Sequence, residues 1–85
     1  MATPKRIADL KAYCEQWEEC LNGVITRMDE LRRWQDEGMH IFEKDDTQDL
    51  LPTMIEEADY AARNLKTILI RMQDLHNRAI AGEDV

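Results

Sequence analysis

Apolar residues recur along the first part of the chain with an alternating spacing of three and four. The series is Ile7, Leu10, Cys14, Trp17, Leu21, Val24, Met28 and Leu31. Because this spacing is the a/d pattern of a left-handed coiled coil, it predicts a helix with one apolar edge. Thr3 and Pro4 form an N-cap and first-turn pair at its start. Phe42 returns to the same phase, so the predicted helix covers about 4–44, with a bend near Gly38.

A second apolar series keeps the complementary spacing in the other half of the chain. It comprises Met54, Ala58, Ala61, Leu65, Ile68, Met72, Leu75 and Ala79. This series predicts a second helix over about 53–81, with Thr53 and Glu56 as a capping box and Gly82 as its terminator. An acidic loop over about 45–52 joins the helices, and 82–85 form a short acidic tail. The predicted fold is a single all-α domain of residues 1–85, an antiparallel two-helix coiled-coil hairpin.

The register of this hairpin predicts an unpaired end. Pairing Phe42 with Met54 also aligns Leu31 with Leu65 and leaves Leu10 without a partner in its own chain. Exposed apolar turns are costly in water, so a second copy is expected to cover them in a four-helix-bundle dimer. The predicted partner or dimer interface consists of Ile7, Leu10, Tyr13, Cys14, Trp17, Trp34 and Ile41. The alternative is a monomer whose first turns fold back at Gly23.

Composition fits one small domain, with 44% hydrophobic and 34% charged residues among 85. No apolar run approaches the roughly 20 residues of a membrane span, and no secretory signal is present, so no membrane association and a cytoplasmic location are expected. Cys14 and Cys20 lie too far apart on one helix to form a disulfide with each other. Two reduced core thiols are expected, with pairing between chains as the alternative.

Negative charge gathers around the predicted bend. Residues 35–59 hold nine acidic residues and one lysine, whereas the whole chain has a net charge of −7. The acidic tip is defined as Asp36, Glu37, Glu43, Asp45, Asp46 and Asp49. It either docks on a basic surface of another protein or is a solvated loop whose neighbouring charges complement the helix dipole. Direct nucleic-acid binding is not expected, because phosphate contacts need clustered basic residues.

Two acidic patterns suggest metal chemistry, and both are weak. Glu37 and His40 have the Glu-x-x-His spacing of metal-binding bundles, but they occupy outer positions of the predicted helix and have no second pair. The carboxylate pairs of magnesium-dependent nucleotide pyrophosphatases have a superficial counterpart in Glu15, Glu18, Glu56 and Asp59, which the register sends to opposite ends. Neither a glycine-rich phosphate loop nor a nucleophile beside a base is present.

The sequence therefore predicts no catalytic, cofactor-binding or metal-binding residues and no cofactor. The favoured hypothesis is a non-enzymatic protein–protein interaction module, such as a small regulator, chaperone or inhibitor. A structural assembly subunit without another partner is one alternative. A divalent-metal-dependent helical enzyme of the pyrophosphatase type is the other.

Overall fold

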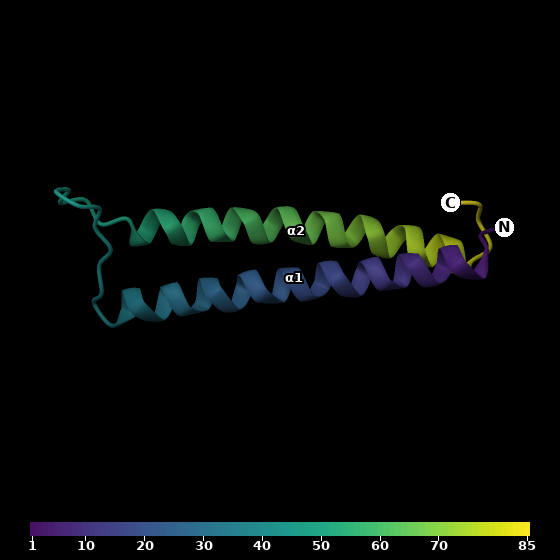
Figure 1. Ribbon diagram of the computed structural model, residues 1–85, viewed down its shortest axis with the longest axis horizontal. Coiled ribbons are helices and arrows are strands. Elements are labelled where there is room, and N and C mark those ends of the chain that lie inside the picture. The colour runs from purple at the N-terminus through teal and green to yellow at the C-terminus, as the bar shows by residue number, and fades with distance from the viewer.

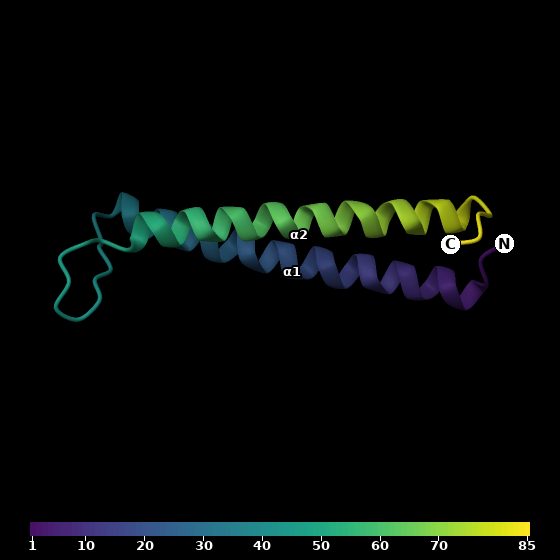
Figure 2. The same ribbon diagram turned by 90° about the horizontal axis from the view of Figure 1, so that it is seen from above.

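The computed structural model covers residues 1–85 and consists of two long helices that pack side by side in opposite directions (Figure 1). Helix α1 spans Pro4–Asp36 and helix α2 spans Leu51–Ile80. Residues 37–50 connect them at one end, and both termini lie at the other end (Figures 1 and 2). The molecule measures 59 × 18 × 16 Å. The predicted all-α helical hairpin is confirmed.

The start of α1 follows the predicted capping chemistry. The Thr3 hydroxyl oxygen accepts a hydrogen bond from the Arg6 backbone N–H at 3.2 Å. Pro4 occupies the first turn, where a missing backbone donor costs nothing. The helix continues through Gly23 without a break, so the chain does not fold back there as the alternative required.

The end of α1 differs from the prediction, because the helix stops at Asp36 and does not reach Lys44. Gly38 has a φ of +80°, the left-handed conformation that glycine adopts most readily. The Met39 N–H donates to the Trp34 carbonyl at 2.9 Å, and the Gly38 N–H donates to the Gln35 carbonyl at 3.0 Å. This pair of bonds is the Schellman arrangement that terminates helices. Gly38 therefore ends the helix where a bend was expected.

The connection is accordingly longer than the predicted loop over 45–52, and it has its own hydrogen bonds. The Leu50 N–H donates to the Ile41 carbonyl at 2.7 Å, which closes the loop at its base. Asp45 has a φ of 64° next to a turn in which the Asp46 N–H donates to the Glu43 carbonyl. These bonds supply partners that a long irregular segment otherwise lacks.

Helix α2 begins at Leu51, two residues before the predicted start. Its N-cap, Leu50, makes no side-chain capping bond, so the capping box predicted for Thr53 and Glu56 is wrong. The Asp49 carboxylate replaces it by accepting a hydrogen bond from the Leu51 N–H at 3.0 Å. Gly82, with a φ of +92°, terminates the helix as predicted.

The predicted overhang of α1 is wrong, because the pairing of the helices is displaced by one heptad. Leu10 is 1% exposed and packs with Ala79 and Ala2 in one buried cluster. Ile7 and Leu75 pack against the same cluster, so the first turns of α1 are covered by their own chain. Both apolar series repeat every seven residues, so a shift of seven keeps each series at the seam. The spacing alone cannot distinguish the two registers, and the prediction followed from extending α1 beyond Gly38.

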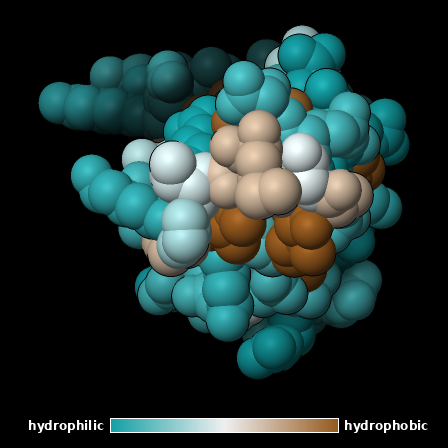
Figure 3. Space-filling view, turned by 90° about the vertical axis from the view of Figure 1, so that its right-hand side faces the viewer, coloured by the Kyte–Doolittle hydropathy of each residue, from teal (hydrophilic) through white to brown (hydrophobic).

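The core of the hairpin is small for a chain of this length. Eight of the 85 residues are buried, and they include a second cluster of Leu21, Ala62 and Leu69. The accessible surface is 6439 Å², whereas a compact monomer of this mass exposes roughly 5200 Å². The radius of gyration is 18.6 Å, against roughly 12 Å for a compact domain of the same length. Viewed from the end with the termini, apolar residues gather between polar outer surfaces (Figure 3).

Candidate interaction surface

The two buried rows of the helices divide the hairpin into two long sides. Leu21 and Met28 are buried on α1, and Ala62 and Leu69 are buried on α2. Residues seven apart lie along nearly one line of a helix, and successive residues advance by about 100°. We call the line of these buried residues on each helix the contact line. In an antiparallel pair, residues that follow the contact line by three positions point to the same side of the hairpin on both helices. The two sides of the contact line have different chemistry.

One side is a groove with charged margins, which we call the charged groove. It has a volume of about 260 Å³, and Leu21, Met28 and Ala62 contribute to its apolar lining. The remaining lining residues are Ile25, Asp29, Arg32, Asp59, Arg63 and Lys66. Arg63 and Asp59 form an ion pair at 2.8 Å across one turn of α2. This side combines an apolar floor with charges of both signs, which is typical of a solvated helix surface.

The opposite side is an apolar stripe, which we call the open face. Its residues follow the contact line by three positions, or precede it by one, four or eight. From α1 it contains Tyr13, Trp17, Cys20, Val24, Leu31 and Trp34, and from α2 Met54, Ala58, Ala61, Leu65, Ile68, Met72 and Leu75. None of them is buried: Tyr13 is 41% and Trp34 39% exposed, and Trp17 and Val24 are half-buried. The other helix of the hairpin therefore covers most of the predicted heptad positions only in part.

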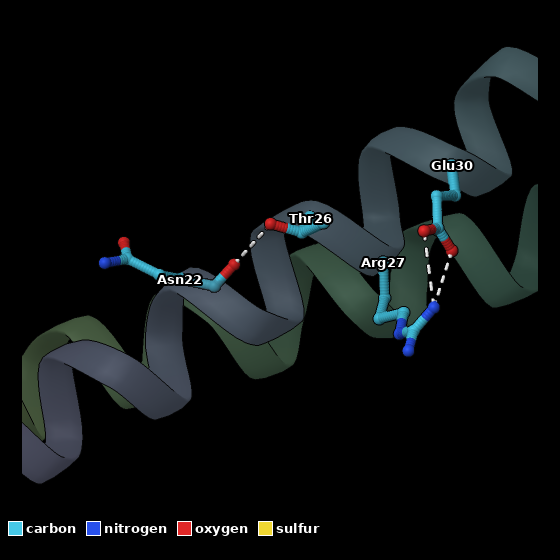
Figure 4. Close-up of polar contacts among 4 residues, drawn as sticks. All are labelled: Asn22, Thr26, Arg27 and Glu30. Carbon is cyan, nitrogen blue, oxygen red and sulfur yellow. Dashed lines mark hydrogen bonds and ion pairs between the residues drawn. The ribbon is translucent and has the colours of Figure 1, made fainter.

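The open face is nearly free of charge between the ends of the helices. Arg27 is the charged residue at its margin, and its guanidinium forms an ion pair with Glu30 at 3.0 Å on the outside of α1 (Figure 4). Thr26, next to Arg27, directs its hydroxyl to the Asn22 carbonyl at 2.9 Å (Figure 4). Arg27 and Thr26 thus both find their partners on their own helix.

The predicted interface residues divide into three groups. Leu10 is buried within its own chain, and Ile7 and Cys14 are half-buried and pack against the buried clusters that α1 forms with α2. Ile41 lies in the connection, where its N–H donates to the Asp49 carboxylate. Tyr13, Trp17 and Trp34 belong to the open face. The α2 half of that face was predicted as part of the seam and was missed as a surface, although its heptad spacing was visible in the sequence.

The acidic tip lies around the connection. Asp36 is the last residue of α1, Glu37 is its C-cap, and the other four members belong to residues 37–50. Asp49 differs from the rest because its Oδ1 accepts hydrogen bonds from the Ile41 and Leu51 N–H groups, at 2.9 and 3.0 Å. Its Oδ2 lies 2.9 Å from His40 Nδ1. The hydrogen bond with His40 and those from the backbone lower the pKa of Asp49 to about 2. Asp49 therefore acts as a structural anchor of the loop.

The residue patterns that suggested metal chemistry do not converge. The structure brings no three His, Cys, Asp or Glu side chains into an arrangement that could hold a metal ion. His40 pairs with Asp49 and not with Glu37, since α1 ends before the Glu-x-x-His segment becomes helical. In the observed register, Glu18 and Asp59 are separated by roughly 18 Å along the hairpin axis, so the carboxylate pairs stay apart.

The two cysteines have different surroundings. Cys14 is half-buried, and burial raises the pKa of its thiol above the ordinary value. Cys20 is exposed on the open face, which corrects the expectation of a core thiol at this position. Both are free thiols in the hairpin. His76 is half-buried.

Comparison with protein families, curated proteins and solved structures found no match for this chain. Neither helix contains a stretch that is long and apolar enough to cross a lipid bilayer.

Proposed function

We propose that this chain is a non-enzymatic protein–protein interaction module that binds another polypeptide through its open face. The observation that carries the proposal is the unburied apolar stripe with its two tryptophans, Trp17 and Trp34, which are the only tryptophans of the chain. Aromatic side chains in a nearly uncharged patch are typical of protein interfaces.

The size and shape of the patch support a helical partner. Its rows run along residues 13–34 of α1 and 54–75 of α2, so a partner helix would lie lengthwise against them. Amphipathic helices bind such surfaces through residues at the same three- and four-residue spacing. A contiguous apolar patch of this extent is uncommon on a monomer that has no binding role.

A quantitative affinity purification tests the proposal with a matched pair of variants. Tyr13 lies on the open face and is 41% exposed, whereas Tyr60 lies on the outer side of α2 and is 69% exposed. The tagged wild-type chain and the Tyr60→Glu variant should each co-purify the same polypeptide in a fixed molar ratio. The Tyr13→Glu variant should lose this polypeptide. Co-expression of an untagged second copy in the same cells shows whether that polypeptide is the chain itself. Equal recovery with all three chains would contradict the proposal.

The acidic tip supports a second candidate surface, for a partner with basic residues. It has six carboxylates and, among residues 36–49, one lysine. Apart from Asp49, its carboxylates have no ion pair within the chain, so they are free to meet external cations. Exchange of Asp45 and Asp46 for lysine should weaken binding to such a partner at low salt and leave binding through the open face unchanged.

A further inference from the structure

We infer that the occupant of the open face is a second copy of this chain, arranged so that the two connections lie at opposite ends of the dimer. The inference rests on the proposed function, because it takes the open face as the binding surface and names its partner. Three observations support it: the area of the face, its lack of charge, and the uneven charge along the hairpin.

The area matches what a stable dimer needs. The open face extends over residues 13–34 of α1 and 54–75 of α2, roughly 33 Å at 1.5 Å per residue. With a hairpin width of 18 Å, it presents roughly 600 Å² in projection, at the lower end of the ~600–1000 Å² that each partner buries in a standard interface. The hairpin also exposes roughly 1200 Å² more surface than a compact monomer of its mass. Pairing of two hairpins through this side would build a four-helix core.

The distribution of charge around the hairpin favours the open face over the charged groove. A symmetric contact sets the same patch of both copies together. The open face carries one charged residue, Arg27, which directly precedes the buried Met28 and is paired with Glu30 at 3.0 Å, so a second copy adds only one further, already paired, arginine to the contact. The charged groove is lined by Arg32, Arg63 and Lys66 together with Asp29 and Asp59. Self-pairing through that side would take these five charged groups out of water, which is costly unless each of them finds a partner of opposite charge.

The distribution of charge along the hairpin fixes the direction of the second copy. Residues 36–49 carry six acidic residues and one lysine, a net charge of −5. At the end with the termini, residues 1–11 have a net charge of +2 and residues 78–85, with Arg78, Glu83 and Asp84, have a net charge of −1. Connections at the same end would place two strongly negative tips side by side, within about one screening length. Connections at opposite ends place each tip near the weakly positive terminal end of the other copy, with Val24 and Ile68 near the two-fold axis.

Molar mass in solution tests the occupant of the face. Light scattering coupled to gel filtration should give twice the chain mass of 10.0 kDa for the wild type and for Tyr60→Glu, and the single-chain mass for Tyr13→Glu. Circular dichroism verifies that each variant keeps its helices. Cys20→Glu, at an exposed position of the same face, is the second variant if Tyr13→Glu loses helicity. A mass of 10.0 kDa for the wild type at all concentrations, or a doubled mass for both open-face variants, would overturn the inference.

Pulsed electron paramagnetic resonance tests the direction. A single spin label at Thr47→Cys, with Cys14→Ala and Cys20→Ala, reports the distance between the two connections. A distance approaching the 59 Å length of the hairpin is expected, whereas a distance near its 18 Å width would overturn the arrangement. A monomeric chain that still retains another polypeptide through Tyr13 in the affinity purification would overturn only the second copy as occupant. A monomeric chain that also retains no other polypeptide in the affinity purification would overturn the proposed function as well.

Discussion

Truncation of Leu10 distinguishes the observed register from the one that the heptad spacing suggested. Leu10 is 1% exposed and packs with Ala79, which is also 1% exposed, and with Ala2. Truncation of a buried leucine to alanine lowers the free energy of unfolding by about 2–5 kcal/mol in well-packed sites. This cluster lies at the end of the hairpin beside the short terminal segments, which can move into the cavity. We therefore expect Leu10→Ala to lower the free energy of unfolding by about 2.5 kcal/mol.

This loss is large against the stability of a chain of 85 residues, which is roughly 4–13 kcal/mol. In a domain of this size 1 kcal/mol corresponds to roughly 4–8 °C, so Leu10→Ala should lower the melting temperature by roughly 10–20 °C. Thermal unfolding followed by circular dichroism at 222 nm measures the change. The lowest usable protein concentration is appropriate, because association then contributes least.

Ile80→Ala is the matched control at the same end of the hairpin. Ile80 is 60% exposed, so its truncation should change the free energy of unfolding by less than about 0.5 kcal/mol. If α1 overhung α2 as the sequence predicted, Leu10 would have no partner in its own chain and would behave like Ile80. Equal melting temperatures for the two variants would refute the observed packing of the first turns.

Three further predictions concern the helix ends, the connection and the thiols. Gly23→Ala should stabilise the hairpin by roughly 0.5–1 kcal/mol, because Gly23 lies within α1 with open space around it. Gly38→Ala should destabilise the hairpin by roughly 1 kcal/mol, because the φ of Gly38 is +80°. Urea unfolding measures both changes, and a gain in stability for Gly38→Ala would contradict the Schellman arrangement at the end of α1. The Asp49 carboxylate has a folded-state pKa of about 2 against an ordinary value of 3.8. Its contribution to stability should therefore be complete above pH 3.8 and be lost as the pH falls through 2. NMR titration of the carboxyl group checks this, and a midpoint at the ordinary value would show that the hydrogen bonds of Asp49 in the loop are absent. Cys20 should react with a thiol-specific disulfide reagent faster than Cys14, whose thiol is half-buried with a raised pKa; equal rates in the two single-cysteine variants would contradict this difference.

The sequence predicted the features that local chemistry decides. The spacing of Leu21, Val24 and Met28 was sufficient to predict α1, and Thr3 and Gly82 were correctly assigned to helix ends, because caps depend on a few adjacent residues. The all-α hairpin follows from two apolar series with a polar segment between them. These signals are contained within one or two turns of the chain.

The features that the sequence did not predict depend on contacts between distant residues. Gly38 is compatible with either a bend or an end, and its left-handed conformation is stabilised by hydrogen bonds that the pattern of apolar residues does not reveal. An error at that position moved the register by one heptad and produced the overhang of Leu10. The open face was also missed, because heptad positions such as Ile68 and Met72 were assumed to be fully covered in a two-helix seam. Two helices cover only one side of such a row, so the rest stays exposed until a further polypeptide packs on it.

The concentration dependence of tryptophan emission is the most direct test that the open face is the surface that becomes covered. Both tryptophans, Trp17 and Trp34, belong to that face. The emission maximum should lie at shorter wavelength in the associated chain, move to longer wavelength on dilution, and remain at long wavelength for Tyr13→Glu at every concentration. An emission maximum that stays constant while the molar mass doubles would contradict the account, because the chain would then associate through another surface.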